Sequence, residues 1–287
     1  GSGWPGLSDR GYGRSRPRPG RVRRDLREVS FEQAATRREG HRSREGRGVV
    51  GAAPAPVKAR PARASDPDAY DGGWVTQPDA GPILRQNLAK RLAADGASVA
   101  LTYSASPAKA EEVVHVIANE GGRAIAISAD AGDPAAVRAA VARTVETFGR
   151  IDILVNNAGL ALGGPIEGIE FETYQRMIAI NVTGVFVATQ EAVRYMKDGG
   201  RIIHIGSSMT RYAAFPTASL YTLTKGAITG FNRSLVRDLG PKGITVSTVH
   251  PGPTDTDMNP DGGPVSDIVK PGIALGRYGQ SHEIAGV

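Results

Sequence analysis

From about residue 83 to the end of the chain, apolar residues alternate between two regular patterns. Short continuous apolar runs are typical of strands buried on both faces, and they occur at Ser98–Tyr103, Arg123–Ala129, Ile151–Val155, Arg201–Ile205 and Ile244–Val249. Apolar residues spaced three or four apart are typical of amphipathic helices, and they occur at 107–119, 134–148, 171–197 and 217–239. The alternation predicts an α/β fold with a parallel sheet covered by helices on both faces.

A further helix and its entrance loop precede the first of these runs. Leu84, Leu88 and Leu92 repeat every four residues, and the Asp95-Gly96 pair predicts the end of this helix. In a nucleotide-binding βαβ unit, glycines before such a helix let backbone N–H groups approach a pyrophosphate. Here the loop offers Gly81 followed by Pro82. The segment therefore reads either as a dinucleotide-binding entrance of altered sequence or as an ordinary helix.

Composition narrows the class of protein. With 287 residues and 40% apolar content, the chain can bury a core the size of one large α/β domain. It contains no apolar run of membrane-spanning length, so we expect no membrane protein. The absence of cysteine excludes disulfides and thiolate metal sites and suits the cytoplasm. The five histidines show no ligand spacing, so no metal site is expected.

The basic charge of the chain lies in its first quarter. The first 70 residues hold 16 Lys and Arg against 8 Asp and Glu, whereas the whole chain has a net charge of +6. This segment is rich in Arg, Gly and Pro without periodicity, which predicts a disordered leader at 1–72 before a folded domain at 73–287. A nucleic-acid-binding arm or a transit peptide are alternatives. Interspersed acids count against both, so we expect no nucleic-acid partner.

The candidate chemistry centres on Tyr221 and Lys225, which stand four residues apart on a predicted helix. This spacing places a phenol and an ammonium on one helix face. A nearby cation favours phenolate and lowers the pKa of a phenol, which would bring it into range for proton transfer. The alternative is a core tyrosine beside a lysine whose stem lies along apolar surface.

Three more features lie where a parallel sheet would place a ligand. Ser208 follows a buried strand and precedes Tyr221 by thirteen residues. The run 156–159, Asn-Asn-Ala-Gly, ends another buried strand with small residues that allow close backbone approach. Asn181 lies on the apolar stripe of a helix, so both ends of its amide need partners. A serine cap, an Asx turn and a core asparagine are the structural alternatives.

Taken together, these motifs resemble the short-chain dehydrogenase/reductase family, most closely its 3-oxoacyl-acyl-carrier-protein reductase-like members. The resemblance rests on Asn-Asn-Ala-Gly at 156–159, Asn181, Ser208, Tyr221-x-x-x-Lys225 and His-Pro-Gly-Pro-Thr-Asp-Thr at 250–256. It implies a Rossmann-type, doubly wound parallel sheet and NAD(P)H-dependent reduction of a carbonyl, or the reverse oxidation of an alcohol.

The resemblance also implies residue roles. Tyr221 would be the general acid/base, Ser208 would hold the substrate oxygen and Asn181 would hold a proton-relaying water. Lys225 would lower the tyrosine pKa and bind the nicotinamide ribose, and Asp130 would contact adenine. The other expected cofactor positions are Gly81, Tyr103, Ser104, Asn156, Ala158, Gly159, Pro251, Gly252 and Thr254, together with Tyr221 itself.

The chain departs from the family pattern at both ends. The family motif Thr-Gly-x-x-x-Gly-x-Gly keeps Thr76 and Gly81, but Gln77 and Ile83 replace glycines. The first strand has barely three apolar residues, and the sequence stops near the start of a late family helix, so we expect an incomplete sheet at its first and last strands. A catalytically impaired relative that acts through association is therefore the alternative to an active reductase.

Cofactor, substrate and assembly can be ranked from the same residues. Tyr103, Ser104 and Ser106 follow the second strand without an acid, and an acid there would favour NAD(H), so we expect NADP(H) to be preferred. The resemblance implies a 3-oxoacyl-like ketone as substrate and a homodimer or homotetramer formed through 171–197 and 217–239. The Gly- and Pro-rich segment 257–276 is the expected substrate lid, and its composition suggests mobility.

Overall fold

The computed structural model describes residues 73–76, 82–213, 216–263 and 266–287. The leader predicted at 1–72 and the loop that contains Gln77 and Gly81 lie outside these residues. The described elements form an α/β fold with a parallel sheet, as predicted.

The main sheet has six parallel strands in the order β3-β2-β1-β4-β5-β6. The strands are β1 (Gly73–Thr76), β2 (Ser98–Tyr103), β3 (Arg123–Ser128), β4 (Ile151–Asn156), β5 (Arg201–Ile205) and β6 (Thr245–Val249). The short first strand is formed: its four residues pair with β2 on one side and β4 on the other. Chain order reverses between β1 and β4, and ligands of open α/β sheets bind at the carboxyl ends of the strands beside such a point.

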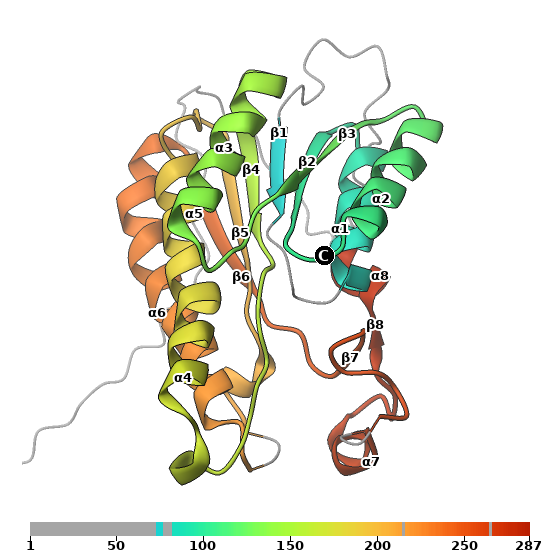
Figure 1. The fold of residues 1–287 in the computed structure, drawn as a ribbon, viewed down its shortest axis with the longest axis vertical. Coiled ribbons are helices and arrows are strands. Elements are labelled where there is room, and N and C mark those ends of the chain that lie inside the picture. Colours follow the sequence, from blue (N-terminus) through green and yellow to red (C-terminus); the bar gives the residue numbers. More distant parts are fainter. Residues whose placement is uncertain (1–72, 77–81, 214–215, 264–265) are drawn as a thin grey trace, which may run out of the picture. The chain divides into compact units, whose positions relative to one another are not determined.

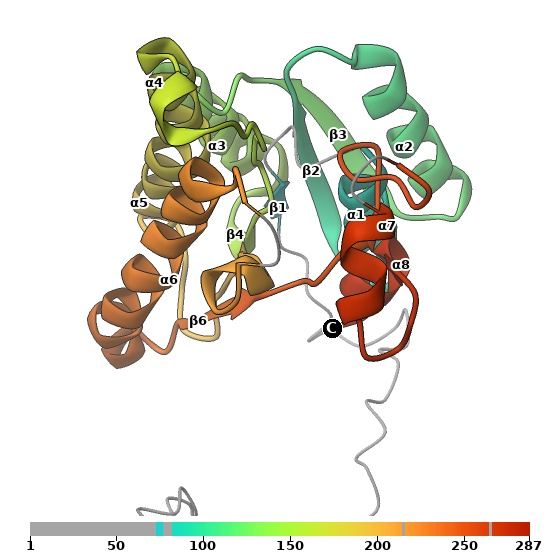
Figure 2. The ribbon, with the colours of Figure 1, turned by 90° about the horizontal axis from the view of Figure 1, so that it is seen from below.

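Helices cover both faces of the sheet (Figure 1). On one face lie α1 (Pro82–Ala94), α2 (Pro107–Asn119) and α8 (Ser281–Ala285), which enclose a core that includes Leu88, Val99 and Ile117. On the other lie α3 (Pro134–Phe148), α5 (Val185–Ala192) and α6 (Ser219–Leu239), which enclose a core that includes Leu154, Ile202 and Leu235. Figure 2 shows the main sheet between α3, α5 and α6 on one side and α1, α2 and α8 on the other. Strands buried by both layers explain the continuous apolar runs in the sequence.

The single helix expected at 171–197 is interrupted. It consists of α4 (Phe171–Ile178), a π-helical turn η2 (Ala179–Gly184) and α5, which ends at Ala192. The turn lies where the helix passes close to the loop after β3, since a Cβ on Gly184 would collide with the carbonyl oxygen of Ala131. The π turn also contains the buried Asn181, and π turns of this kind are common at functional sites.

A small two-stranded sheet follows β6, formed by β7 (Thr254–Asp255) and β8 (Gly279–Gln280) (Figure 1). Between them lie α7 (Ser266–Val269) and the 3-10 turn η5 (Lys270–Gly272), within the segment expected to be a lid. Tyr278 anchors this segment, because its ring is 1% exposed and its hydroxyl donates to the Asn259 side chain at 3.4 Å. The remaining short turns are η1 (Ile166–Gly168), η3 (Ser208–Thr210) and η4 (Gly240–Lys242).

Candidate active site

Tyr221 and Lys225 occupy the first two turns of α6, where the helix passes the carboxyl ends of β4 and β5. Tyr221 is partly buried, and its phenol shares a hydrogen bond with the Ser207 hydroxyl. Desolvation raises the pKa of Tyr221, and the bond to Ser207 offsets only part of that rise. The net shift is upward and Lys225 is not among its causes, so the lowering of this pKa by Lys225 stays a prediction. Tyr221 is a neutral phenol at neutral pH.

The serine beside Tyr221 is Ser207 rather than the expected Ser208. Ser207 is 7% exposed, and its hydroxyl also accepts from the Met209 backbone N–H at 3.2 Å. Ser208 opens the turn η3, and its backbone N–H donates to the Pro251 carbonyl at 2.9 Å. Two adjacent serines precede Tyr221 by fourteen and thirteen residues, so sequence spacing alone left the choice between them open. Ser207 has an extended backbone at the start of η3, and its hydroxyl is bonded to the phenol.

Lys225 is buried in the same region, with 5% of its surface exposed. Its Nζ donates to the carbonyl oxygen of Ile205, the last residue of β5, at 2.9 Å and lies 5.9 Å from the centre of the Tyr221 ring. Burial lowers the pKa of Lys225 to about 8. Gly159 makes room for this ammonium, because a Cβ at position 159 would stand 3.2 Å from Nζ.

The side-chain amide of Asn181 forms hydrogen bonds within the protein at both of its ends. Its Oδ1 accepts from the Leu160 backbone N–H at 2.7 Å, and its Nδ2 donates to the Leu160 carbonyl at 2.8 Å and to Thr224 Oγ1 at 2.9 Å. The side chain therefore joins the loop after β4 to α6, one residue before Lys225. Of the side-chain atoms, only the second lone pair of Oδ1 is left for the water expected from the sequence.

His204 is a site residue that sequence reasoning missed. Its ring is completely buried on β5, packs against Phe231, and pairs through Nδ1 with Asn156 Nδ2 at 3.1 Å. Asn156 Nδ2 also donates to Thr189 Oγ1 at 3.1 Å. Desolvation first, and then the charge of Lys225, lower the pKa of His204 to about 4. The signal was a histidine among the apolar residues of the strand run Ile-Ile-His-Ile at 202–205.

The end of β4 fits a polar ligand. Ala158 and Asn157 are buried, and within the described residues neither end of the Asn157 amide nor Asn156 Oδ1 has a hydrogen-bond partner. Buried amides of this kind normally have partners. These atoms, with the close approach allowed at Gly159, lie beside the point where chain order reverses, which fits a dinucleotide held by the strand ends.

The ends of β2 and β3 hold the other expected cofactor positions. Tyr103 ends β2, Ser104 follows it, and the Tyr103 carbonyl accepts from Ala129 at 2.8 Å. Asp130 lies just beyond β3 in a bidentate ion pair with Arg176 of α4. Arg85, in the first turn of α1, is 3% exposed and donates to the Thr102 carbonyl at 3.4 Å, a basic residue near β2 that the sequence reading did not place.

The loop after β6 holds the last of the expected cofactor positions at the strand ends. Pro251 accepts the Ser208 N–H, and Thr254 is 8% exposed with its hydroxyl donating to the Gly252 carbonyl at 3.0 Å. This loop therefore adjoins the turn that bears both serines. Gly81, the remaining expected position, lies outside the described residues.

Two further observations bear on the class of site. In the described part of the chain, no three His, Cys, Asp or Glu side chains are grouped to hold a metal ion. None of the described helices is long and apolar enough to cross a membrane.

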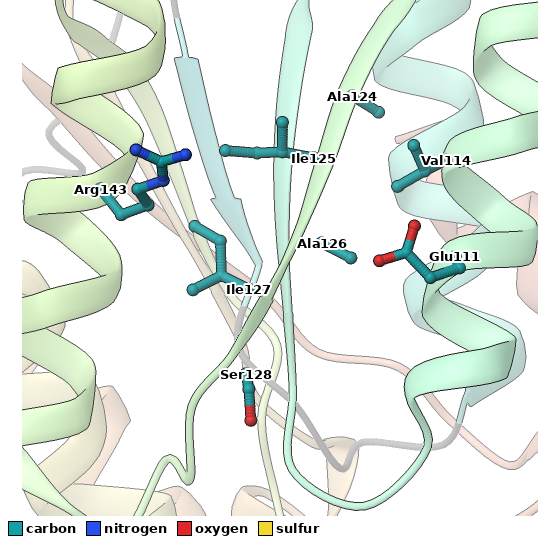
Figure 3. Close-up of a pocket in the computed structure, with 8 residues that line it drawn as sticks. All are labelled: Glu111, Val114, Ala124, Ile125, Ala126, Ile127, Ser128 and Arg143. Atoms are coloured by element: carbon teal, nitrogen blue, oxygen red, sulfur yellow. The ribbon is translucent and has the colours of Figure 1, made fainter.

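A separate groove runs along β3, away from Tyr221. It is lined by Glu111, Val114, Arg143 and strand residues 124–128 (Figure 3). Figure 3 shows Arg143 on one side of the strand and Glu111 on the other. Because β3 is an edge strand of the sheet, the groove follows exposed backbone and shares no residue with the Tyr221 and Lys225 site.

Comparison with known proteins identifies the class of this fold and site. The family model for short chain dehydrogenases matches residues 84–264. The chain belongs to the short chain dehydrogenase family and is an NAD(P)-dependent dehydrogenase/reductase of that family. The match begins inside α1, after the altered glycine loop.

Individual relatives agree with this assignment. A short-chain dehydrogenase/reductase from Serratia marcescens BCRC 10948 is 46% identical, with a TM-score of 0.73, covering 76% of this chain and 89% of that one. A short chain dehydrogenase from Burkholderia cenocepacia J2315, solved in complex with NADP, is 43% identical with a TM-score of 0.74 and the same coverage. The 3-oxoacyl-[acyl-carrier-protein] reductase of a Synechocystis species is 36% identical over 199 residues, which is 68% of this chain and 78% of that protein.

Proposed function

We propose that this protein is an NADP(H)-dependent oxidoreductase that reduces a 3-oxoacyl-like ketone to a secondary alcohol, or performs the reverse reaction. The observation that carries the proposal is the grouping of the Tyr221 phenol, the Ser207 hydroxyl and the Lys225 ammonium at the carboxyl ends of β4 and β5. A phenol donor, a hydroxyl donor and a buried cation are suited to a substrate oxygen that gains negative charge.

Each side chain has a distinct task in the reduction. When bound, the nicotinamide cofactor supplies the hydride that reduces the carbonyl carbon. Tyr221 donates its proton to the carbonyl oxygen, and its raised pKa keeps the phenol protonated for this step. Ser207 donates a hydrogen bond to the same oxygen. In this assignment Ser207 takes the role that the sequence suggested for Ser208.

Lys225 and Asn181 support that step. The ammonium of Lys225 favours the phenolate left after proton transfer and would hold the nicotinamide ribose, and its contact with Ile205 fixes it beside Tyr221. Asn181 fixes the loop after β4, where Asn156, Ala158 and Gly159 would lie along the cofactor. A proton relay water at Asn181 would use its main-chain carbonyl.

The preference for NADP(H) has two supports. The residues after β2, Tyr103 and Ser104, place no carboxylate against a 2′-phosphate, and Arg85 brings a guanidinium to the backbone one residue before Tyr103. The relative from Burkholderia cenocepacia was solved with NADP. Arg85→Met should weaken NADPH binding at least tenfold more than NADH binding, because only NADPH has the extra phosphate. Equal losses for both nucleotides would contradict the preference.

A cofactor titration and a substrate screen test the function. Isothermal titration with NADPH should give a saturable heat, and loss of NADPH absorbance should follow addition of a 3-oxoacyl thioester. Small ketones, sugars and steroid-like ketones in the same screen define the substrate class. A chain that binds neither NADPH nor NADH would instead be the impaired relative that acts through association.

We also propose a homodimer or homotetramer built through α4, α5 and α6. Large apolar side chains are exposed on these helices, namely Phe171, Tyr174, Phe186, Leu223 and Val236. Large apolar side chains exposed in number on neighbouring helices favour an association surface. Sedimentation should give a dimer or tetramer, and Leu223→Glu with Val236→Glu should shift it toward monomer. A cytoplasmic location is proposed from the absence of cysteine, and cell fractionation tests it.

A further inference from the structure

Asp130 and Arg176 form a two-pronged ion pair between the end of β3 and α4. Arg176 Nη1 lies 2.9 Å from Asp130 Oδ2, and Nη2 donates to Oδ1 at 3.0 Å. The backbone N–H of Gly132 donates to the same Oδ1 at 2.8 Å. This fork geometry fixes the plane of the carboxylate, which a single contact would leave free to rotate.

Gly132 allows the guanidinium to reach this position. A Cβ at residue 132 would stand 2.5 Å from Arg176 Nη1 and 3.2 Å from Cγ1 of Ile180. The turn that begins at Asp130 is closed by a bond from the Asp133 N–H to the Asp130 carbonyl at 3.0 Å. Backbone, glycine and arginine therefore form one socket around the Asp130 carboxylate.

Within this socket the Asp130 carboxylate can still accept a hydrogen bond from a ligand. Oδ1 is used by Gly132 and Arg176, whereas Oδ2 contacts only Arg176 among the described residues, which leaves a lone pair of Oδ2 for a ligand. The Asp130 side chain is 40% exposed, so a ligand at the strand ends can reach it. Desolvation raises the pKa of Asp130, but the hydrogen bonds from Arg176 and the Gly132 amide together lower it by more. The net pKa of Asp130 is therefore below its usual value. An ionised carboxylate accepts hydrogen bonds and donates none.

Ion pairs with this exposure contribute little to folding stability. The contact lies just beyond β3, next in the sheet to β2, at whose end the proposed function places the 2′-phosphate, and the family resemblance expects Asp130 to contact adenine. A fixed, ionised acceptor there would bind a 6-amino group and repel a 6-oxo group, because the latter presents a second acceptor.

Resting on the proposed function, we infer that Arg176 is a positioning residue for base selection: it holds the Asp130 carboxylate so that the cofactor site accepts a 6-aminopurine and rejects a 6-oxopurine. The residue acts through Asp130 and takes no part in hydride or proton transfer.

Fluorescence titrations with three reduced nucleotides test this inference. The probes are NADPH, its hypoxanthine analogue deamino-NADPH, and reduced nicotinamide mononucleotide, which lacks the purine base. The parent protein should bind NADPH about ten- to hundredfold more tightly than deamino-NADPH, the range of a hydrogen bond to a charged group. Arg176→Met should reduce this ratio to about threefold or less, and binding of the mononucleotide should not change.

Matched variants separate positioning from general damage. Arg176→Lys should retain part of the ratio, since it keeps the charge but lacks the fork. Asp130→Asn should lose or reverse the preference, because an amide can donate to a 6-oxo group. Arg91→Met, which removes an exposed ion pair with Asp95 on α1, should leave all three affinities unchanged.

Two results would overturn the inference while leaving the proposed function in place. One is a parent protein that binds NADPH and deamino-NADPH equally. The other is an Arg176→Met protein that keeps the parental ratio, or that loses all three nucleotides to the same extent. A parent protein that binds none of the three would overturn the proposed function together with this inference.

Discussion

The side chain of Asn181 binds the backbone of Leu160 from both directions, donating to its carbonyl at 2.8 Å and accepting from its N–H at 2.7 Å. The loop that follows β4 is held to the π turn η2 by this pair of bonds. Since Asn181 Nδ2 also reaches Thr224, the same amide connects that loop with the helix that bears Tyr221 and Lys225.

Replacing Asn181 should therefore reduce both stability and cofactor binding. Asn181→Leu leaves the Leu160 N–H and carbonyl without their partner, and we expect the free energy of unfolding to fall by about 2–4 kcal/mol. Urea denaturation measures the loss. The control is Asn119→Leu at the exposed end of α2, which should change the free energy by less than about 0.5 kcal/mol. Equal, small effects of the two substitutions would contradict the role given to Asn181.

The two adjacent serines should differ sharply in turnover. Ser207→Ala removes the hydroxyl beside Tyr221 and should lower kcat by roughly 10²–10³-fold, the usual effect of losing one donor to a developing oxyanion. Ser208→Ala should stay within about threefold of the parent. Steady-state kinetics with NADPH and the best carbonyl substrate decide between them. The reverse order of effects would restore Ser208 to the role suggested by its spacing.

Tyr221 and Lys225 should act as a coupled unit. Tyr221→Phe keeps the ring and should lower turnover by roughly 10²–10⁴-fold without loss of NADPH binding. Lys225→Ala should lower both turnover and cofactor affinity. The double variant should be far less impaired than the product of the two losses, since Lys225 acts on the proton step through Tyr221. A folded Tyr221→Phe protein with parental turnover would refute the mechanism.

Cofactor affinity should fall as the pH rises through about 8. Lys225 has a pKa of about 8, so it is an ammonium below this value and loses its charge above it. Bound dinucleotide phosphates favour the ammonium and raise its pKa, so binding takes up a proton and weakens with increasing pH. Fluorescence titration between pH 7 and 9.5 should show this trend in the parent. The Lys225→Met protein should bind the cofactor more weakly at pH 7 and should not lose affinity as the pH rises. Identical pH profiles of the parent and the variant would assign the loss of affinity to another ionisable group.

His204 should make the fold acid-sensitive. Its pKa is about 4 in the folded protein and near 6.5 when unfolded, so between these values the unfolded chain binds more protons. Stability from neutral His204 is complete above pH 6.5 and decreases as the pH falls, by about 2 kcal/mol at pH 5 and about 3 kcal/mol below pH 4. His204→Asn should lose less stability than the parent between pH 7 and 5 in urea denaturation. Parallel losses would show that the histidine does not contribute.

Much of the fold follows from sequence pattern alone. The predicted runs at Ser98–Tyr103 and Arg201–Ile205 are strands with those bounds, and the helices predicted at 107–119 and 134–148 are also observed. Such segments are long and periodic, so local propensity and burial point to the same structure. The spacing of Tyr221 and Lys225 needed only the helical repeat to be placed on one face.

The tertiary structure was needed wherever the local sequence pattern was compatible with two structures. The run 171–197 has helical periodicity throughout, but its close approach to Ala131 at Gly184 coincides with a π turn that periodicity does not reveal. The short first strand becomes central through pairing with both β2 and β4, which supply hydrogen bonds that its own four residues cannot.

The site shows the same division. The sequence by itself determined that a serine, a tyrosine, a lysine and an asparagine would gather at the strand ends, because parallel strands end on one edge of the sheet. Only the tertiary structure decided that Ser207 faces Tyr221, that His204 pairs with Asn156 and that Arg176 holds Asp130. These contacts join residues from different elements, and their geometry depends on backbone direction and packing, which no spacing along the chain specifies.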